Sequence, residues 1–309
     1  MRPAAPARRP HQLTAGGILG SWKQLSPSQY HALGLGTAFG VTDVGKVRTS
    51  NQDNFHISPE LGLLVVADGM GGHEGGEIAS TEAIGQLCCF IAAARGQAST
   101  APYDADATAA VFRASAFDPV AADPDATWTD ATMKAMITLH DAVEFANARV
   151  YAENIARHHA DGTGMGTTLT GMWQPAPRGP VFLFHVGDSR LYCWRGGRLE
   201  QLTRDQTLYQ QALDLGMPGP LPPRNLLLQA LGPTATVKPE LLTRTVAPGD
   251  VYLLCSDGLY GDAAPDAIAA ILARARDDNL DACCADLVAM ATQNGGRDNI
   301  TAVLLRCPD

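Results

Sequence analysis

The sequence has no surplus of basic residues and no long apolar run. Its 23 Lys and Arg stand against 32 Asp and Glu, so the chain lacks the positive charge that neutralises the phosphates of a nucleic acid. No apolar segment approaches the length of a membrane span, and the stretch LTAGGILG behind the basic N-terminal residues is too short and glycine-broken for a signal peptide. We therefore expect a soluble, cytoplasmic protein with neither a nucleic-acid nor a membrane partner.

Cysteine usage argues against a disulfide-rich or zinc-binding protein. The seven cysteines include no C-x-x-C spacing. The adjacent pairs Cys88/Cys89 and Cys283/Cys284 fall inside apolar segments with helical character. This pattern favours reduced thiols in the core over disulfides or zinc ligands.

The chain divides into an N-terminal segment without periodicity and one long folded region. Residues 1–35 are rich in Pro, Ala, Arg and Gly, which predicts a disordered tail. Residues 36–309 are predicted to form one domain, since α/β-containing folds of this size need not divide. Strand patterns fall in adjoining hairpins and helical patterns are grouped elsewhere, which favours an α+β layered architecture over alternating βαβ units.

Hydrophobic periodicity places the main elements of this region. Strands are expected at 37–45, 53–58, 61–68, 181–194, 251–261 and 298–306, and helices at 77–94, 131–158, 265–276 and 280–294. Residues 96–130 are interpreted as a loop-like insertion that could include one short helix. Residues 205–236 combine DQTLYQQALDLG with the proline-laden PGPLPPRN and are interpreted as an irregular, lid-like excursion.

Four aspartates stand where apolar strands end or in adjoining turns: Asp53, Asp68, Asp257 and Asp298. Each one alone could cap a turn or a helix. Aspartate is depleted within strands and costly to bury unpaired, so four such junctions in one chain suggest a common partner. A hard divalent cation, Mg²⁺ or Mn²⁺, suits a set of oxygen ligands.

The stretch ADGMGGHEGGE, residues 67–77, surrounds one of these aspartates with glycines. Gly69 leaves its own carbonyl unobstructed, so this oxygen could be a further metal ligand beside Asp68. The later glycines allow a sharp turn from strand to helix. A phosphate-cradling loop is the alternative, but the stretch matches neither G-x-G-x-x-G nor G-x-x-x-x-G-K-[ST] and carries Asp and Glu where such a loop has Lys.

Seven motifs in order resemble the metal-dependent protein serine/threonine phosphatases of the protein phosphatase 2C type, in their bacterial form. They are R-x-x-x-Q-D at 48–53, ADGMGG at 67–72, GMGTTL at 164–169, HVGDSRLY at 185–192, LTRDQT at 202–207, LLCSDGL at 253–259 and GGRDNIT at 295–301. The resemblance covers nearly all of residues 36–306. It implies a four-layer α-β-β-α sandwich, with a central antiparallel β-sandwich, a two-metal centre at one edge and a flap at about 205–236.

The resemblance also implies roles for individual residues. Asp68 would bridge two Mn²⁺ or Mg²⁺ ions, assisted by Asp53 and the carbonyl of Gly69. Asp257 and Asp298 would complete one metal's ligands. Asp161, five residues before Gly166, would help to bind a third, weaker metal, although its DGT context also suits a helix-ending turn.

The implied reaction is attack of a metal-activated water on the phosphorus of phosphoserine or phosphothreonine, without a phosphoenzyme. Arg48 stands at the phosphate-binding position, where its donor fork would stabilise transition-state charge. Met70 stands where some eukaryotic relatives carry a histidine proposed as a general acid, so leaving-group protonation must come from elsewhere. His73 is kept outside the catalytic set.

Other differences and partners follow from the same resemblance. Asp188 and Ser189 are interpreted as structural support for the site. Pro222 and Pro223 replace a histidine–proline pair in the flap, which puts the usual lid behaviour in doubt. The expected partners are phosphorylated proteins and an opposing bacterial Ser/Thr kinase, with the protein acting as a monomer.

Two other classes stay open. A pseudophosphatase or adaptor would share the fold without turnover, but such proteins should lose metal-binding aspartates, and every core position is present here. Another metal hydrolase, such as a nuclease, would need basic groove residues that the net charge of -9 does not supply.

Overall fold

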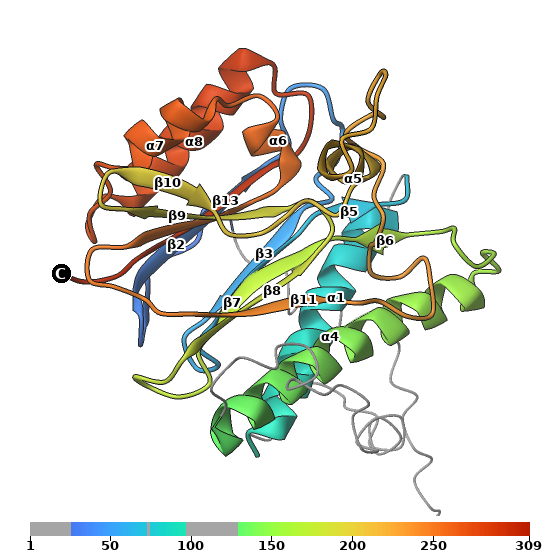
Figure 1. Ribbon diagram of the computed structural model, residues 1–309, viewed down its shortest axis with the longest axis horizontal. Coiled ribbons are helices and arrows are strands. Elements are labelled where there is room, and N and C mark those ends of the chain that lie inside the picture. Colours follow the sequence, from blue (N-terminus) through green and yellow to red (C-terminus); the bar gives the residue numbers. More distant parts are fainter. Residues whose placement is uncertain (1–25, 73–74, 97–128) are drawn as a thin grey trace, which may run out of the picture.

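Two antiparallel β-sheets form the centre of the computed structural model, which describes residues 26–72, 75–96 and 129–309 (Figure 1). The six-stranded sheet has the order β1 (His31–Leu33), β2 (Gly36–Asp43), β13 (Ile300–Arg306), β12 (Val251–Cys255), β9 (Arg190–Arg195) and β10 (Arg198–Gln201). The five-stranded sheet has the order β11 (Glu240–Arg244), β8 (Val181–Val186), β7 (Leu169–Trp173), β4 (Leu63–Ala67) and β3 (Asn54–Ser58). A two-stranded ribbon pairs β5 (Gly69–Met70) with β6 (Gly166–Thr167). The predicted α+β class is confirmed.

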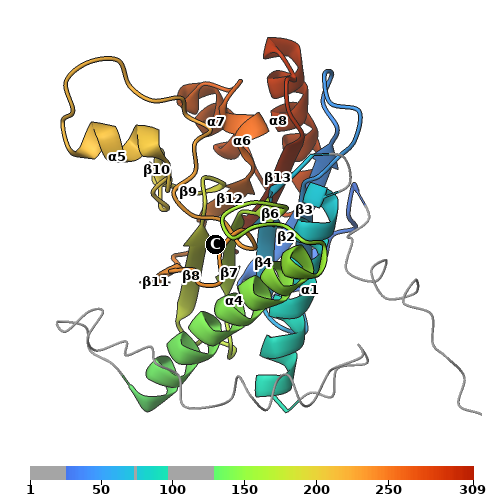
Figure 2. The ribbon, with the colours of Figure 1, turned by 90° about the vertical axis from the view of Figure 1, so that its right-hand side faces the viewer.

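Two pairs of helices cover the outer faces of these sheets (Figures 1 and 2). The helices are α1 (Gly75–Ala94), α4 (Asp130–Ala156), α5 (Leu208–Asp214), α6 (Asp257–Tyr260), α7 (Pro265–Leu272) and α8 (Leu280–Asn294). Helices α1 and α4 pack on the five-stranded sheet, and α7 and α8 pack on the six-stranded sheet. Helix α5 belongs to the flap and projects from the body of the molecule (Figure 2).

Strand β4 shows how the sequence produces stacked layers. All five of its residues are buried. Because successive side chains point to opposite faces, Leu63 and Val65 join the core beneath α1 and α4, while Leu64 and Val66 join the core between the two sheets. A continuous apolar run is what a strand buried on both faces requires.

Helix α1 qualifies by length and composition as a possible membrane span, contrary to the expectation that no segment would. In this structure 61% of its apolar window is buried. Its side chains Ile84, Leu87 and Ile91 are fully buried in the core that α1 shares with α4 and the five-stranded sheet. The apolar character of α1 is therefore that of a core helix covered on most sides.

Two sequence-based assignments need correction, and others concern residues that the structure does not describe. His31–Leu33 was placed in a disordered tail but forms β1, which pairs with β2. Strand β11 was not predicted, and it pairs in full register with β8. Residues 1–25, most of the predicted 96–130 insertion, and His73 lie outside the described residues. All seven cysteines are buried and free, which confirms the prediction of core thiols.

Candidate metal and phosphate site

A pocket of about 490 Å³ opens where strands of both sheets end on the same side of the molecule. Its lining comprises Arg48, Thr49, Ser50, Gln52, Asp68, Gly69, Met70, Gly71, Gly72, Thr168, Asp188, Asn225, Leu227, Asp257, Asp298 and Asn299. Most of the residues that the sequence predicted for metal and phosphate binding are in this set. The topology thus brings together positions up to 250 residues apart in the chain.

The four predicted aspartates are placed by the ends of four strands. Asp53 precedes β3, Asp68 links β4 to β5, Asp257 begins α6 after β12, and Asp298 precedes β13. Strands β3 and β4 belong to one sheet, and β12 and β13 belong to the other. The site is therefore built across the edge shared by the two sheets.

Asp53 lies behind the pocket, with only 2% of its surface exposed. Its Oδ2 accepts hydrogen bonds from the hydroxyls of Ser256 at 2.6 Å and Thr301 at 2.7 Å. Burial raises the pKa of Asp53 to about 7, against the lowering effect of these hydroxyls and with a further increase from Asp257 and Asp298. Asp53, beside a strand of the five-stranded sheet, is thus held by hydroxyls at two strands of the six-stranded sheet.

Asp68 and Asp257 lie close enough for their carboxyl groups to interact directly. Burial, followed by the charge of Asp53, raises the pKa of Asp68 well above its ordinary value. Burial, followed by the charge of Asp298, likewise raises the pKa of Asp257. Such a cluster of carboxylates is costly unless protons or cations compensate it.

One buried carboxylate oxygen in this cluster has no compensation from the protein. Among the described residues, Oδ1 of Asp257 is buried without any hydrogen-bond partner. Buried polar atoms are normally paired, so this orphan marks a place where a ligand belongs. An oxygen set with an unpaired member and mutually repelling charges fits a hard divalent cation.

Arg48 supplies a positive charge on the rim of the pocket. Its guanidinium donates to Oδ2 of Asp298 at 2.6 Å, and its side chain is 52% exposed. The loop that carries Arg48 is fixed by Asn299, whose amide donates to the carbonyls of Val44 at 3.0 Å and Ser50 at 2.9 Å. This loop-holding role of Asn299 was missed, although the residue stands beside Asp298 in the RDN motif.

Gly69 and Gly76 are glycines because two backbones pass very close together. A methyl group on Gly69 would collide with the carbonyl of Gly76 and lie 2.6 Å from the carbonyl oxygen of Gln52. This close approach seats the first turn of α1 against β5, beside Asp68. The turn between them uses positive φ at Gly71 (136°) and Gly72 (65°), as the predicted sharp reversal requires.

We expect Gly76→Ala to destabilise the protein, because its new methyl group would lie 2.6 Å from a backbone carbon of Gly69. The thermal midpoint should fall by about 5 °C or more. Gly75→Ala is the matched control, since its methyl group would meet only the Met165 side chain at 3.3 Å. Equal thermal midpoints for the two variants in differential scanning calorimetry would contradict the close-packing explanation.

Asp188 takes a more direct part in the pocket than the sequence predicts. It was predicted to give structural support, yet it lines the pocket with 6% of its surface exposed. Burial, followed by the charge of Asp257, raises its pKa to about 7. Its neighbour Ser189 does act structurally, because its hydroxyl is 2.7 Å from that of Thr168, which accepts from the Asp68 backbone N–H at 2.9 Å.

Asp161 is not brought to this pocket. It is exposed in the connection between α4 and β6 and is absent from the pocket lining. The neighbouring Gly162 donates its backbone N–H to the carbonyl of Pro233 at 2.8 Å. Asp161 therefore stands apart from the other predicted ligands, while Met70 lines the pocket as expected.

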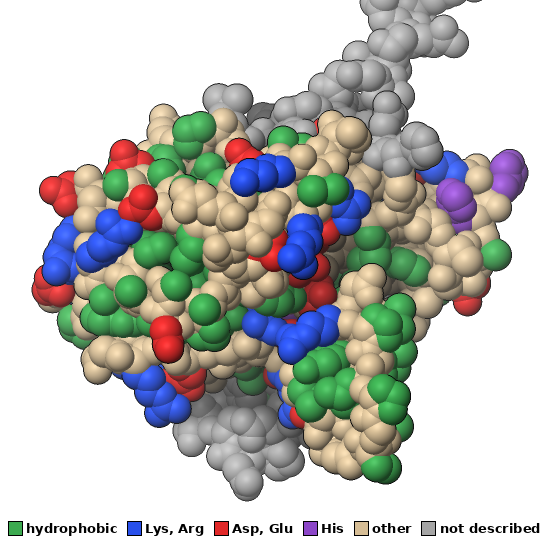
Figure 3. Space-filling view, turned by 90° about the horizontal axis from the view of Figure 1, so that it is seen from above, with side chains coloured by type: hydrophobic (Ala, Val, Ile, Leu, Met, Phe, Trp, Pro, Cys, Tyr) green, Lys and Arg blue, Asp and Glu red, His purple; other side chains and the backbone are tan. Residues whose placement is uncertain are grey.

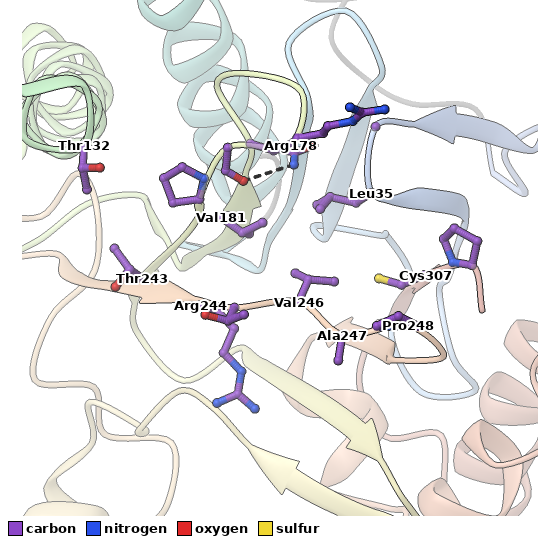
Figure 4. A pocket seen from close by; sticks show the side chains of 16 residues that line it. Leu35, Thr132, Arg178, Val181, Thr243, Arg244, Val246, Ala247, Pro248 and Cys307 are labelled. Carbon is purple, nitrogen blue, oxygen red and sulfur yellow. Dashed lines mark hydrogen bonds between the residues drawn. The ribbon is translucent and has the colours of Figure 1, made fainter. Parts of the chain in front are cut away.

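A larger cavity of about 640 Å³ lies elsewhere (Figure 4). Leu35, Val181, Val246 and Cys307 line it, and no carboxylate is among the described residues of its walls. It cannot assemble an oxygen-rich cation site. The smaller pocket, and not this larger cavity, contains the carboxylates that a cation site requires.

The fold and the pocket together define a two-sheet protein with a cluster of carboxylates that could hold divalent cations and an exposed arginine beside them. The model of the protein phosphatase 2C family matches residues 45–304. The chain belongs to this family.

Individual relatives agree with this assignment. The serine/threonine protein phosphatase PstP of Mycobacterium tuberculosis is 32% identical over 268 residues, which cover 85% of this chain and 43% of PstP. The chain thus spans less than half the length of that relative. The serine/threonine phosphatase Stp of Listeria monocytogenes is 30% identical over 277 residues, which cover 85% of this chain and 93% of Stp. The PstP catalytic domain in complex with two manganese ions superposes with a TM-score of 0.65 at 30% identity, over 88% of this chain and 98% of that domain.

Proposed function

We propose that this protein is a metal-dependent protein serine/threonine phosphatase that hydrolyses phosphoserine and phosphothreonine. The observation that carries the proposal is the convergence of Asp68, Asp257 and Asp298 with Arg48 in one pocket, where a buried Asp257 oxygen has no protein partner. Its relatives PstP and Stp are named as phosphatases of this kind.

We propose two roles for the residues of this pocket, which are cation binding and phosphate binding. Asp68, with Asp53 and the Gly69 carbonyl, would hold two Mn²⁺ or Mg²⁺ ions, and Asp257 and Asp298 would complete the set. When bound, such a metal pair lowers the pKa of water so that it can attack phosphorus in line. Arg48 would bind the phosphoryl oxygens and orient the ester. Met70 has no proton to donate, and we propose that water protonates the leaving oxygen instead.

Further parts of the proposal rest on family likeness. The three apolar cores support the four-layer α-β-β-α order, with residues 205–236 as a flap over one end. We propose that Asp161 serves a third, weaker metal only if its loop moves toward the pocket. A cytoplasmic monomer that opposes a bacterial Ser/Thr kinase remains the expected setting.

The test is phosphate release from a phosphothreonine peptide as Mn²⁺ is titrated at pH 6 and pH 8. Burial raises the pKa of Asp53 to about 7, so a proton occupies this carboxyl at pH 6 and leaves by pH 8. Since metal binding needs the ionised form of this proposed ligand, the half-activating Mn²⁺ concentration should be about 10-fold lower at pH 8.

Rates at each pH are normalised to those at saturating Mn²⁺, which separates metal binding from the chemical step. Chelation with EDTA should remove the activity, and added Mn²⁺ should restore it. Absence of phosphate release at every Mn²⁺ concentration would favour the pseudophosphatase or adaptor alternative.

A further inference from the structure

The flap, residues 205–236, is the most apolar exposed surface of the described chain. Twelve large hydrophobic side chains are exposed in this part of the protein, and seven of them lie in the flap: Leu208, Leu213, Leu215, Met217, Leu221, Leu226 and Leu228. Figure 3 shows this apolar lobe beside a notch edged by acidic and basic side chains. A surface of this kind is typical of a contact site for another polypeptide.

A second pocket, of about 250 Å³, lies between this flap and the catalytic pocket. The two pockets share Asp188, Asn225 and Asp257 in their linings. Tyr209, Leu213 and Tyr260 add aromatic and apolar walls. A substrate whose phosphate enters the catalytic pocket would therefore extend a neighbouring residue into this second pocket, which we call the flap pocket.

Two arginines line the flap pocket, and among the described residues only one of them lacks a carboxylate partner. Arg190 is already paired with a carboxylate. It makes two hydrogen bonds to Asp205, at 2.8 and 2.6 Å, and its guanidinium carbon lies 3.6 Å from the ring centroid of Tyr260. The charge of Arg190 is therefore already compensated by a carboxylate of the protein.

Arg224 is different. Its guanidinium stacks over Tyr209 at 4.2 Å and donates to the Tyr209 hydroxyl at 2.9 Å, yet no carboxylate among the described residues pairs with it. It is exposed on the flap, away from the three carboxylates in the same lining: Asp188 is buried, Asp205 pairs with Arg190, and Asp257 belongs to the carboxylate cluster of the catalytic pocket. The aromatic ring holds the cation in place without neutralising its charge.

We propose that Arg224 selects phosphoprotein segments that carry an anionic side chain, a carboxylate or a second phosphate, next to the phosphorylated residue. This proposal rests on the proposed phosphatase function and identifies a preferred substrate class for it. The hydrolysed phosphate occupies the catalytic pocket. The flanking anion occupies the flap pocket at the guanidinium of Arg224, and apolar flap side chains contact the segment around it.

The experiment compares three phosphothreonine peptides that differ only at the flanking residue, which is alanine, glutamate or phosphoserine. For the wild-type protein with Mn²⁺, kcat/KM should be about 3-fold higher for the glutamate peptide and about 10-fold higher for the doubly phosphorylated peptide than for the alanine peptide. Both preferences should shrink as salt is raised, because the interaction is exposed.

Arg224→Ala should abolish both preferences, and Arg224→Glu should reverse them, so that the alanine peptide is hydrolysed with a higher kcat/KM than either anionic peptide. Arg198→Glu is the matched control, since Arg198 is an exposed arginine on β10 that lines neither pocket. It should preserve the wild-type order. The alanine peptide and a small aryl phosphate carry no flanking anion. Their rates of hydrolysis therefore measure the activity of the metal site alone.

The outcomes separate this inference from the function on which it rests. No hydrolysis of any peptide by the wild-type protein would overturn the phosphatase assignment. Hydrolysis with equal kcat/KM for the three peptides, or preferences that Arg224→Glu leaves intact, would overturn the role of Arg224 alone. A preference for phosphoserine without one for glutamate would assign the flap pocket to a second phosphate.

Discussion

Asp68→Asn is expected to lower Mn²⁺-dependent phosphate release from a phosphothreonine peptide by about 10³-fold or more, the effect of losing several kcal/mol of metal assistance. Asp68 stands between β4 and β5, and the negative charges of Asp53, Asp257, Asp188 and Asp298 all act on its carboxyl. The amide keeps the shape of the side chain but removes the negative charge that two cations would share. No other described side chain in the pocket stands in the same place between β4 and β5.

A loss of activity through unfolding would look different. Since burial and neighbouring charges raise the pKa of Asp68, its ionised form is costly in the metal-free protein. The metal-free Asp68→Asn variant should therefore unfold at the wild-type temperature or above it, while the increase in thermal midpoint on adding Mn²⁺ should disappear. Asp266→Asn, at an exposed position in α7, is the control that should keep both activity and the Mn²⁺ effect. Substantial turnover by Asp68→Asn would contradict the proposed mechanism.

The aspartates of the site could be predicted because the signal is local. An apolar strand followed directly by aspartate is unusual, and Asp68, Asp257 and Asp298 each stand beside such a strand. What the sequence does not contain is the order of strands, which places β4 and β12 in different sheets that end at one edge. That these aspartates share one site was implied by the resemblance to a known family. The structure places Asp68, Asp257 and Asp298 in one pocket.

The missed features depend on contacts far away in the chain. Strand β11 is partly exposed and lies at a sheet edge, so ELLTR has no continuous apolar run, and its pairing with β8 defines it as a strand. β1 has only three residues and is a strand because β2 pairs with it. Asp188 sits in a turn typical of structural aspartates, and only its burial near Asp257 shows that it faces the pocket.

Arg48→Ala is expected to lower kcat/KM for a phosphothreonine peptide by about 10²-fold, the effect of removing one group that stabilises transition-state charge. Arg48→Lys should recover only part of this loss, because an ammonium group lacks the planar donor fork that matches two phosphoryl oxygens. Inorganic phosphate should also inhibit the alanine variant about 10-fold less strongly, which measures phosphate binding without turnover. Lys46→Ala, at an exposed position in the same loop, should leave both quantities unchanged.

The contact between Arg48 and Asp298 provides a way to distinguish two roles of the arginine. If Arg48 acts mainly by holding Asp298 through their 2.6 Å hydrogen bond, its removal should raise the half-activating Mn²⁺ concentration, and saturating Mn²⁺ should restore the rate. If Arg48 binds the substrate phosphate, the loss should persist at saturating Mn²⁺. Metal activation should then stay constant or improve, because a cation has been removed from beside a metal ligand. We expect the second result, since the exposed guanidinium lines the same pocket as Asp68 and Asp257.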